Sequence, residues 1–103
     1  MITYATDENF KELIAEGFSL VDFFGQHCVP CKALSVILED LEEDMPFVNI
    51  IKVDTDKCPE TAHEYKINGI PDLYFIKDGN TVFHSVGLIS GESIRDKITE
   101  IIY

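Results

Sequence analysis

Positively charged residues are scarce in this sequence. Its 103 residues include 8 lysines and arginines against 19 aspartates and glutamates, which gives a formal net charge of −11 at pH 7. Proteins that bind nucleic acids neutralise phosphates with clusters of basic side chains, and this chain has too few of them to form such clusters. The charge balance therefore excludes nucleic acid as a partner and favours encounters with basic protein surfaces.

Long apolar runs are also missing. No stretch of the sequence approaches the roughly 20 apolar residues that cross a bilayer, so we expect no membrane association. Residues 1–10 lack a basic segment followed by an apolar one, and we therefore expect no signal peptide and a cytoplasmic location.

Cysteine is present only three times, an odd number that does not fit a framework of structural disulfides. Two of the three, Cys28 and Cys31, are separated by two residues. Cysteines at this spacing can close a small disulfide ring or supply two thiolate ligands to one metal ion. The sequence around the pair helps to distinguish these uses.

The cysteine pair lies where a strand is expected to turn into a helix. Residues 18–24 are mostly apolar and aromatic, as in a strand that is buried on both faces. After the pair, apolar residues up to Leu41 recur at the spacing of one helix face. The free N–H groups at a helix N-terminus favour a thiolate, so this position indicates redox chemistry.

The order of the expected elements predicts a single α/β domain over residues 1–103. Strands are expected at residues 2–5, 18–24, 47–53, 73–76 and 81–86, and helices from an N-cap at Thr6 to Gly17, at residues 31–44 and 59–65, and from an N-cap at Ser90 to Ile102. Strands that alternate with helices form parallel pairs, and the closing hairpin adds an antiparallel edge. The result is a mixed sheet with helices on both faces and the cysteines at the carboxyl end of a central strand.

Three residues near the pair have an expected chemical role from the sequence alone. Cys28, nearer the helix end, is expected to be the nucleophile, and Cys31, one turn further on, the resolving thiol. Asp22 interrupts an apolar strand, and burial there would raise its pKa and suit it to exchange a proton with Cys31. Two alternatives remain open, because Asp22 could point to water, and Lys52 could pair with it or, as is usual for a lysine at a strand end, keep its head group solvated.

These residues resemble the thioredoxin family over nearly the whole chain. The resemblance rests on the strand that contains Asp22, Cys28 and Cys31 with Pro30 between them, Lys32, Lys52, the segment from Pro59 to Gly69-Ile70-Pro71, the hairpin with Gly79, and Gly87 before the last helix. It implies a thioredoxin fold, with a five-stranded mixed sheet in the order 1-3-2-4-5 flanked by four helices.

The resemblance also implies a function and a set of site residues. The function is reduction of protein disulfides without a bound cofactor or metal, with thioredoxin reductase as the electron donor and the protein acting as a monomer. Cys28, Cys31, Asp22, Lys52 and Pro71 would form the catalytic set, with Pro71 as a cis-proline facing the cysteines. Substrate would bind at Val29, Pro30, Ile70, Val86 and Gly87, where backbone at Ile70 pairs with an extended segment.

Three positions depart from the family pattern. His27 replaces the usual tryptophan, Val29 the usual glycine between the cysteines, and Asp72 the usual threonine after the cis-proline. A protonated His27 would stabilise a Cys28 thiolate and Asp72 would oppose it; alternatively the two residues pair with each other, or both are solvated.

Parts of the sequence are also compatible with other functions. Cys28, Cys31, Cys58 and His63 could form a zinc site, although Cys58 and His63 lack the close spacing of a second ligand pair. Cys58 could be somewhat reactive, because it lies near a helix start, but we expect an ordinary half-exposed residue. The remaining alternatives are a non-catalytic docking module and a thioredoxin-like protein with a specialised partner that works as an oxidant or isomerase.

Overall fold

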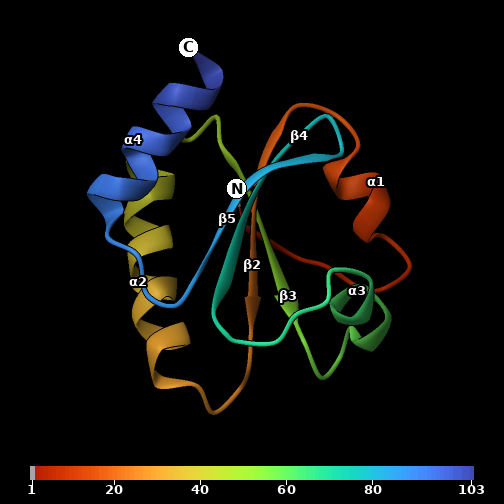
Figure 1. Cartoon of the computed structure of the whole chain (residues 1–103). Coiled ribbons are helices and arrows are strands. Elements are labelled where there is room, and N and C mark those ends of the chain that lie inside the picture. Colours follow the sequence, from red (N-terminus) through yellow and green to blue (C-terminus); the bar gives the residue numbers. More distant parts are fainter. Residues whose placement is uncertain (1) are drawn as a thin grey trace.

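The computed structural model describes residues 2–103, which form a central sheet with helices on both faces (Figure 1). The elements in chain order are β1 (Ile2–Tyr4), α1 (Phe10–Ile14), β2 (Phe18–Phe24), α2 (Val29–Asp44), β3 (Asn49–Asp54), α3 (Pro59–Glu64), β4 (Asp72–Lys77), β5 (Asn80–Val86) and α4 (Gly91–Ile102). The five strands lie in the order β1-β3-β2-β4-β5. The predicted mixed sheet with this order and four flanking helices is confirmed.

Strand β2 lies at the centre of the sheet and divides the core into two halves. It pairs in parallel with β3 and antiparallel with β4. Because side chains alternate along a strand, Leu20 packs in the cluster under α2 and α4, whereas Val21 packs in the cluster under α1 and α3. Figure 1 shows these two helix pairs on opposite sides of the sheet. Asp22 follows the alternation of Leu20 and therefore faces α2.

Helix α1 (Phe10–Ile14) is shorter than the sequence predicts, although Thr6 makes the side-chain contacts of an N-cap. Thr6 and Asn9 hydrogen-bond each other, with Thr6 N donating to Asn9 Oδ1 at 2.8 Å and Asn9 N donating to Thr6 Oγ1 at 3.2 Å. The Asp7 carboxylate accepts hydrogen bonds from Thr61 N at 2.9 Å and from Thr61 Oγ1 at 2.6 Å. Residues 7–9 form a turn, and the regular helix begins at Phe10 rather than directly after Thr6.

The ends of the other elements follow local capping and turn chemistry. Ser90 caps α4 as predicted, since its hydroxyl accepts a hydrogen bond from Ser93 N at 3.1 Å. The third strand begins at Asn49 rather than at Phe47, because Val48 N donates to Met45 O at 3.0 Å and closes a turn after Pro46. In residues 2–103, every helix is too short or too polar to span a membrane.

Candidate active site

The two cysteines of the CxxC sequence are joined by a disulfide at the N-terminus of α2. Cys28 is the N-cap, and its sulfur accepts a hydrogen bond from Cys31 N at 3.2 Å. Cys28 is half-buried, whereas Cys31 lies one turn into the helix and is 2% exposed. A sulfur at this helix end also lies in the positive field of the helix dipole. The solvent therefore reaches one sulfur of the pair more readily than the other.

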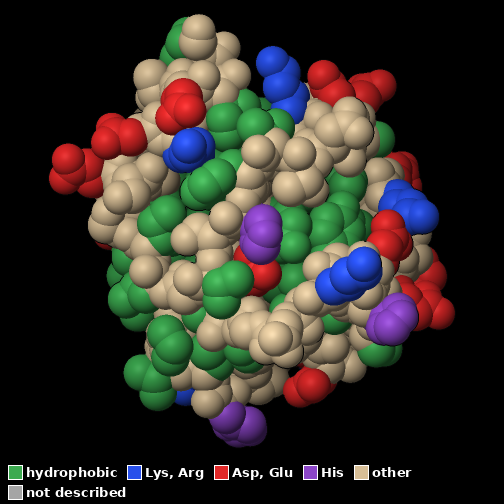
Figure 2. Space-filling view, viewed as in Figure 1, with side chains coloured by type: hydrophobic (Ala, Val, Ile, Leu, Met, Phe, Trp, Pro, Cys, Tyr) green, Lys and Arg blue, Asp and Glu red, His purple; other side chains and the backbone are tan. Residues whose placement is uncertain are grey.

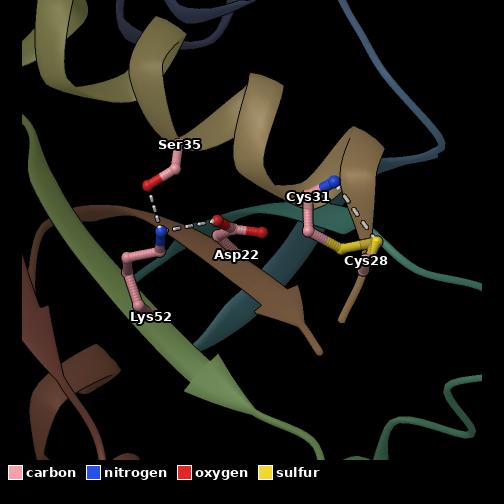
Figure 3. A network of polar contacts seen from close by, with 5 residues as sticks. All are labelled: Asp22, Cys28, Cys31, Ser35 and Lys52. Carbon is pink, nitrogen blue, oxygen red and sulfur yellow. Dashed lines mark hydrogen bonds and ion pairs between the residues drawn. A yellow bond between two sulfur atoms is a disulfide. The ribbon is translucent and has the colours of Figure 1, made fainter. Parts of the chain in front are cut away.

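Asp22 lies beneath the disulfide, in the interior of the protein. Figure 3 shows its side chain between Lys52 and the cysteine pair, under the first turns of α2. The carboxylate is completely buried, and no group in residues 2–103 donates a hydrogen bond to either oxygen with good geometry. Burial raises the pKa of Asp22 from 3.8 to about 6, and the positive charge of Lys52 limits the rise. Asp22 can thus gain or lose a proton near neutral pH.

Lys52 is buried, so the expectation of a solvated head group is wrong. Parallel pairing of β2 with β3 places Lys52 opposite Asp22, and both side chains point toward α2. Its ammonium lies 3.5 Å from Asp22 Oδ2 and donates a hydrogen bond to Ser35 Oγ at 2.6 Å. The ring of Phe24 lies 5.0 Å from the same nitrogen. A hydroxyl acceptor, a nearby carboxylate charge and an aromatic ring together compensate for the burial of this ammonium.

Ser35 is a site residue that the sequence reasoning missed. It follows Cys31 by four positions, which places both residues on the same face of α2. The signal that could have revealed it is a polar residue next to Leu34 and Leu38 on the inward side of the helix. Cys31, Ser35 and Lys52 all line one pocket of about 170 Å³.

The loop before β4 lies against the disulfide. The Ile70–Pro71 peptide bond is cis, and the carbonyl oxygen of Ile70 lies 3.9 Å from Cys28 Sγ. Pro71 O accepts a hydrogen bond from Gly87 N at 2.7 Å, which ties this loop to the end of β5. The backbone of Gly25 lies so close to Ile70 that a Cβ atom at position 25 would be 2.7 Å from the Ile70 side chain. The catalytic candidates Cys28 and Pro71 are thus brought together.

The residues expected to contact substrate surround this loop. Val29 and Val86 are exposed, at 76% and 57%, and Pro30 is also exposed, while Ile70 and Gly87 are half-buried. Figure 2 shows hydrophobic side chains exposed in the centre of the face that contains β5, with acidic side chains mainly at its margins. An apolar centre of this kind suits a protein partner better than a charged small molecule.

The alternative in which Asp72 pairs with His27 is wrong. Asp72 is only 3% exposed, and its Oδ1 lies 2.9 Å from Nδ1 of His84. The His84 ring stacks on Tyr74, with 4.5 Å between the ring centroids. His84 and Asp72 meet because β4 and β5 place them diagonally across one face of the sheet. Asp72 is therefore not solvated either, whereas His27 is exposed next to Cys28.

Cys58 is buried on the other side of the sheet, contrary to the expectation of a half-exposed residue. It packs in the cluster under α1 and α3, and its thiol donates to Ala5 O at 3.3 Å. Burial, followed by the charges of Asp7 and Asp54, raises the pKa of the Cys58 thiol and makes it a poor nucleophile. Within residues 2–103 no three Cys, His, Asp or Glu side chains are grouped so that they could hold a metal ion. The zinc alternative thus lacks a ligand set.

Together, the fold and the site define a class of protein. An α/β sheet places a CxxC disulfide at the carboxyl end of its central strand, with a buried carboxyl group below and a cis-proline beside it. This arrangement belongs to proteins that exchange a dithiol for a disulfide.

Comparisons with known proteins identify the family. The thioredoxin family model matches residues 1–100. The thioredoxin of Chlamydia trachomatis serovar D is 44% identical over 100 residues, which covers 97% of this chain and 98% of that protein. The thioredoxin of Bacillus subtilis is 37% identical over 100 residues, or 96% of each chain, and thioredoxin C-2 of Corynebacterium nephridii is 45% identical over 89 residues, or 84% of this chain and 82% of that protein. The chain belongs to the thioredoxin family.

The family and the site together give the activity. The chain is a thiol–disulfide oxidoreductase with protein-disulfide reductase activity, and Cys28 and Cys31 are its active-site pair. Its family indicates protein disulfides as substrates and a reductase as partner.

Proposed function

We propose that this member of the thioredoxin family acts as a single-domain monomer in the cytoplasm, where it reduces protein disulfides with electrons from thioredoxin reductase. The observation that carries the proposal is the unequal exposure of the two sulfurs, with Cys28 half-buried at the helix end and Cys31 buried behind it. The outer sulfur suits attack on a bulky protein disulfide, and the inner sulfur suits attack within the molecule.

The reaction takes two exchange steps. The Cys28 thiolate attacks one sulfur of the substrate disulfide, forms a mixed disulfide and expels the other substrate sulfur as a thiolate. The Cys31 thiol then gives its proton to the Asp22 carboxylate and attacks Cys28 Sγ, which expels the second substrate thiolate. The substrate gains two electrons, and the chain is left with the Cys28–Cys31 disulfide. The reductase returns two electrons to this disulfide.

Asp22 and Lys52 have separate tasks in the second step. The pKa of about 6 allows the Asp22 carboxylate to be free of a proton at neutral pH and still hold one taken from Cys31. The Lys52 ammonium, 3.5 Å away, keeps the buried carboxylate ionised before the transfer. Lys52 acts through Asp22 and is thus a positioning residue.

Substrate recognition combines backbone and apolar contacts. We assign the backbone of Ile70 to pairing with an extended substrate segment, because this residue lies against Cys28 and is followed by Pro71. The apolar side chains of Val29, Pro30 and Val86, together with the backbone at Gly87, would cover the residues that flank the substrate disulfide.

A coupled assay tests the donor and the direction of electron flow. Catalytic amounts of the chain are expected to accelerate insulin reduction when NADPH and thioredoxin reductase are both present, because the half-exposed Cys28 can reach both partners. The rate is followed by NADPH oxidation, and Cys58→Ala serves as a matched control that is expected to keep the native rate within about twofold, since Cys58 lies on the other side of the sheet.

Two results would contradict the proposal separately. Failure of the reductase to reduce a pair that dithiothreitol does reduce would show that the donor is wrong. Failure of the reduced chain to reduce insulin would contradict the reduction of protein disulfides as its function.

A further inference from the structure

The hydroxyl of Ser35 is the nearest hydrogen-bonding partner of the buried Lys52 ammonium. The Oγ–Nζ distance is 2.6 Å, whereas the distance from the same nitrogen to Asp22 Oδ2 is 3.5 Å. Figure 3 shows Ser35 reaching down from α2 onto the Lys52 ammonium, while Asp22 lies between this ammonium and the cysteine pair. The neutral acceptor is thus closer to the ammonium than the charged one.

Coulomb attraction alone would give the opposite order. A lysine and a carboxylate in a buried setting attract strongly and normally close to a charge-assisted hydrogen bond of about 2.8 Å. The lysine side chain has a flexible stem of four carbons, so the stem itself does not prevent the ammonium from moving closer to the carboxylate. A specific contact is needed to keep the ammonium at 3.5 Å, and the hydrogen bond to Ser35 supplies it.

Among the groups that face Asp22, Lys52 carries the charge that most affects its proton affinity. From β3 the facing charged group is Lys52, and from α2 the facing titratable group is the Cys31 thiol once the disulfide is reduced. From β4 the residue opposite Asp22 is Leu73, which carries no charge. Lys32 lines the same pocket from α2 but is exposed to solvent. Moving the Lys52 ammonium therefore changes the proton affinity of Asp22 directly.

We propose that Ser35 is a positioning residue whose hydroxyl holds the Lys52 ammonium off the Asp22 carboxylate, so that Asp22 keeps enough basicity to take the proton of Cys31. The inference rests on the proposed role of Asp22 as the proton acceptor. Ser35 has no contact with the reacting sulfurs in this assignment and acts only through Lys52.

Ser35→Ala removes the acceptor and leaves the rest of the site in place. The ammonium is then expected to close on Asp22 from 3.5 Å to the length of a charge-assisted hydrogen bond. With an effective dielectric constant near 20, this movement lowers the midpoint of the Asp22 titration by about one pH unit. Ser35→Thr keeps a hydroxyl at the same position and is expected to keep the native midpoint.

The experiment measures the titration of the Asp22 carboxyl carbon by NMR in the oxidised native protein, Ser35→Ala and Ser35→Thr. The proposal expects a fall in the first variant and none in the second. A midpoint that stays or rises in Ser35→Ala overturns it. This measurement requires no turnover, so it does not depend on the role given to Asp22.

A second measurement separates this inference from the proposed function. The reduced proteins are mixed with 5,5′-dithiobis(2-nitrobenzoate), and the second release of nitrothiobenzoate reports the attack of Cys31 on the mixed disulfide. The midpoint of the curve of this rate against pH is expected to fall by about one pH unit in Ser35→Ala. In Asp22→Asn the rate is expected to show no such titration. If the NMR midpoint falls but the rate profile does not move, Ser35 positions Lys52 as proposed and the role of Asp22 as proton acceptor is wrong.

Discussion

Cys28→Ser is expected to lower the rate of protein-disulfide reduction by at least about a thousandfold, because a serine hydroxyl at the helix end cannot replace the attacking thiolate. The thiols that remain cannot substitute for it. Cys31 is 2% exposed and Cys58 is 1% exposed, on the far side of the sheet. Insulin reduction driven by dithiothreitol measures this loss, with Cys58→Ser as the matched single-thiol control.

The Cys58→Ser control shows whether the loss of activity depends on which cysteine is replaced. Cys58→Ser removes a thiol of the same kind and is expected to keep the native rate within about twofold. Turnover that survives in Cys28→Ser within tenfold of the native rate would mean that a different sulfur attacks the substrate, and would contradict the assignment.

Asp22→Asn is expected to change how the free energy of unfolding depends on pH. The folded-state pKa of about 6 lies above the ordinary value of 3.8, so between these values the folded chain binds a proton at Asp22 that the unfolded chain has lost. Stability from this group is therefore complete below pH 3.8 and is lost as the pH rises through 6. The interval of about two pH units corresponds to about 3 kcal/mol at 1.36 kcal/mol for each unit.

The asparagine side chain in Asp22→Asn does not titrate, so the variant is not expected to lose unfolding free energy at position 22 as the pH rises. The difference in unfolding free energy between Asp22→Asn and the native protein is thus expected to shift in favour of the variant by about 2 kcal/mol from pH 4 to pH 7. Urea unfolding of both oxidised proteins across this range measures it, and the other acidic groups cancel in the difference. A difference that stays constant with pH would show that Asp22 has an ordinary pKa.

The parts of the fold that the sequence predicted depend on neighbours along the chain. The apolar run of residues 18–24 and the Ser90 cap are local signals, and both elements form where they were expected. Helix α1 begins later than predicted, after a turn in which the Asp7 carboxylate binds Thr61, 54 residues away. The local capping signal gives no sign of this long-range contact.

In the site, too, the residues marked by their sequence neighbours were predicted, whereas contacts between separate elements were not. The CxxC pair and Asp22 stand out from the residues next to them, since a helix end follows the cysteines and a buried strand surrounds the carboxylate. The pairing of Lys52 with Asp22 was one of two alternatives that the sequence left open, and Ser35 from α2 gave no sign of completing it. The pairing of Asp72 with His84 likewise arises from the register of two strands.

The central claim is that Cys28 captures the substrate and Cys31 releases it. The most direct test is to express Cys31→Ser and Cys28→Ser in cells, block free thiols with acid and an alkylating agent, and locate by mass spectrometry the cysteine that carries each partner. The account predicts that Cys31→Ser accumulates mixed disulfides with cell proteins through Cys28, and that Cys28→Ser accumulates none. Mixed disulfides that form through Cys31 in Cys28→Ser, at levels equal to those in the other variant, would contradict it.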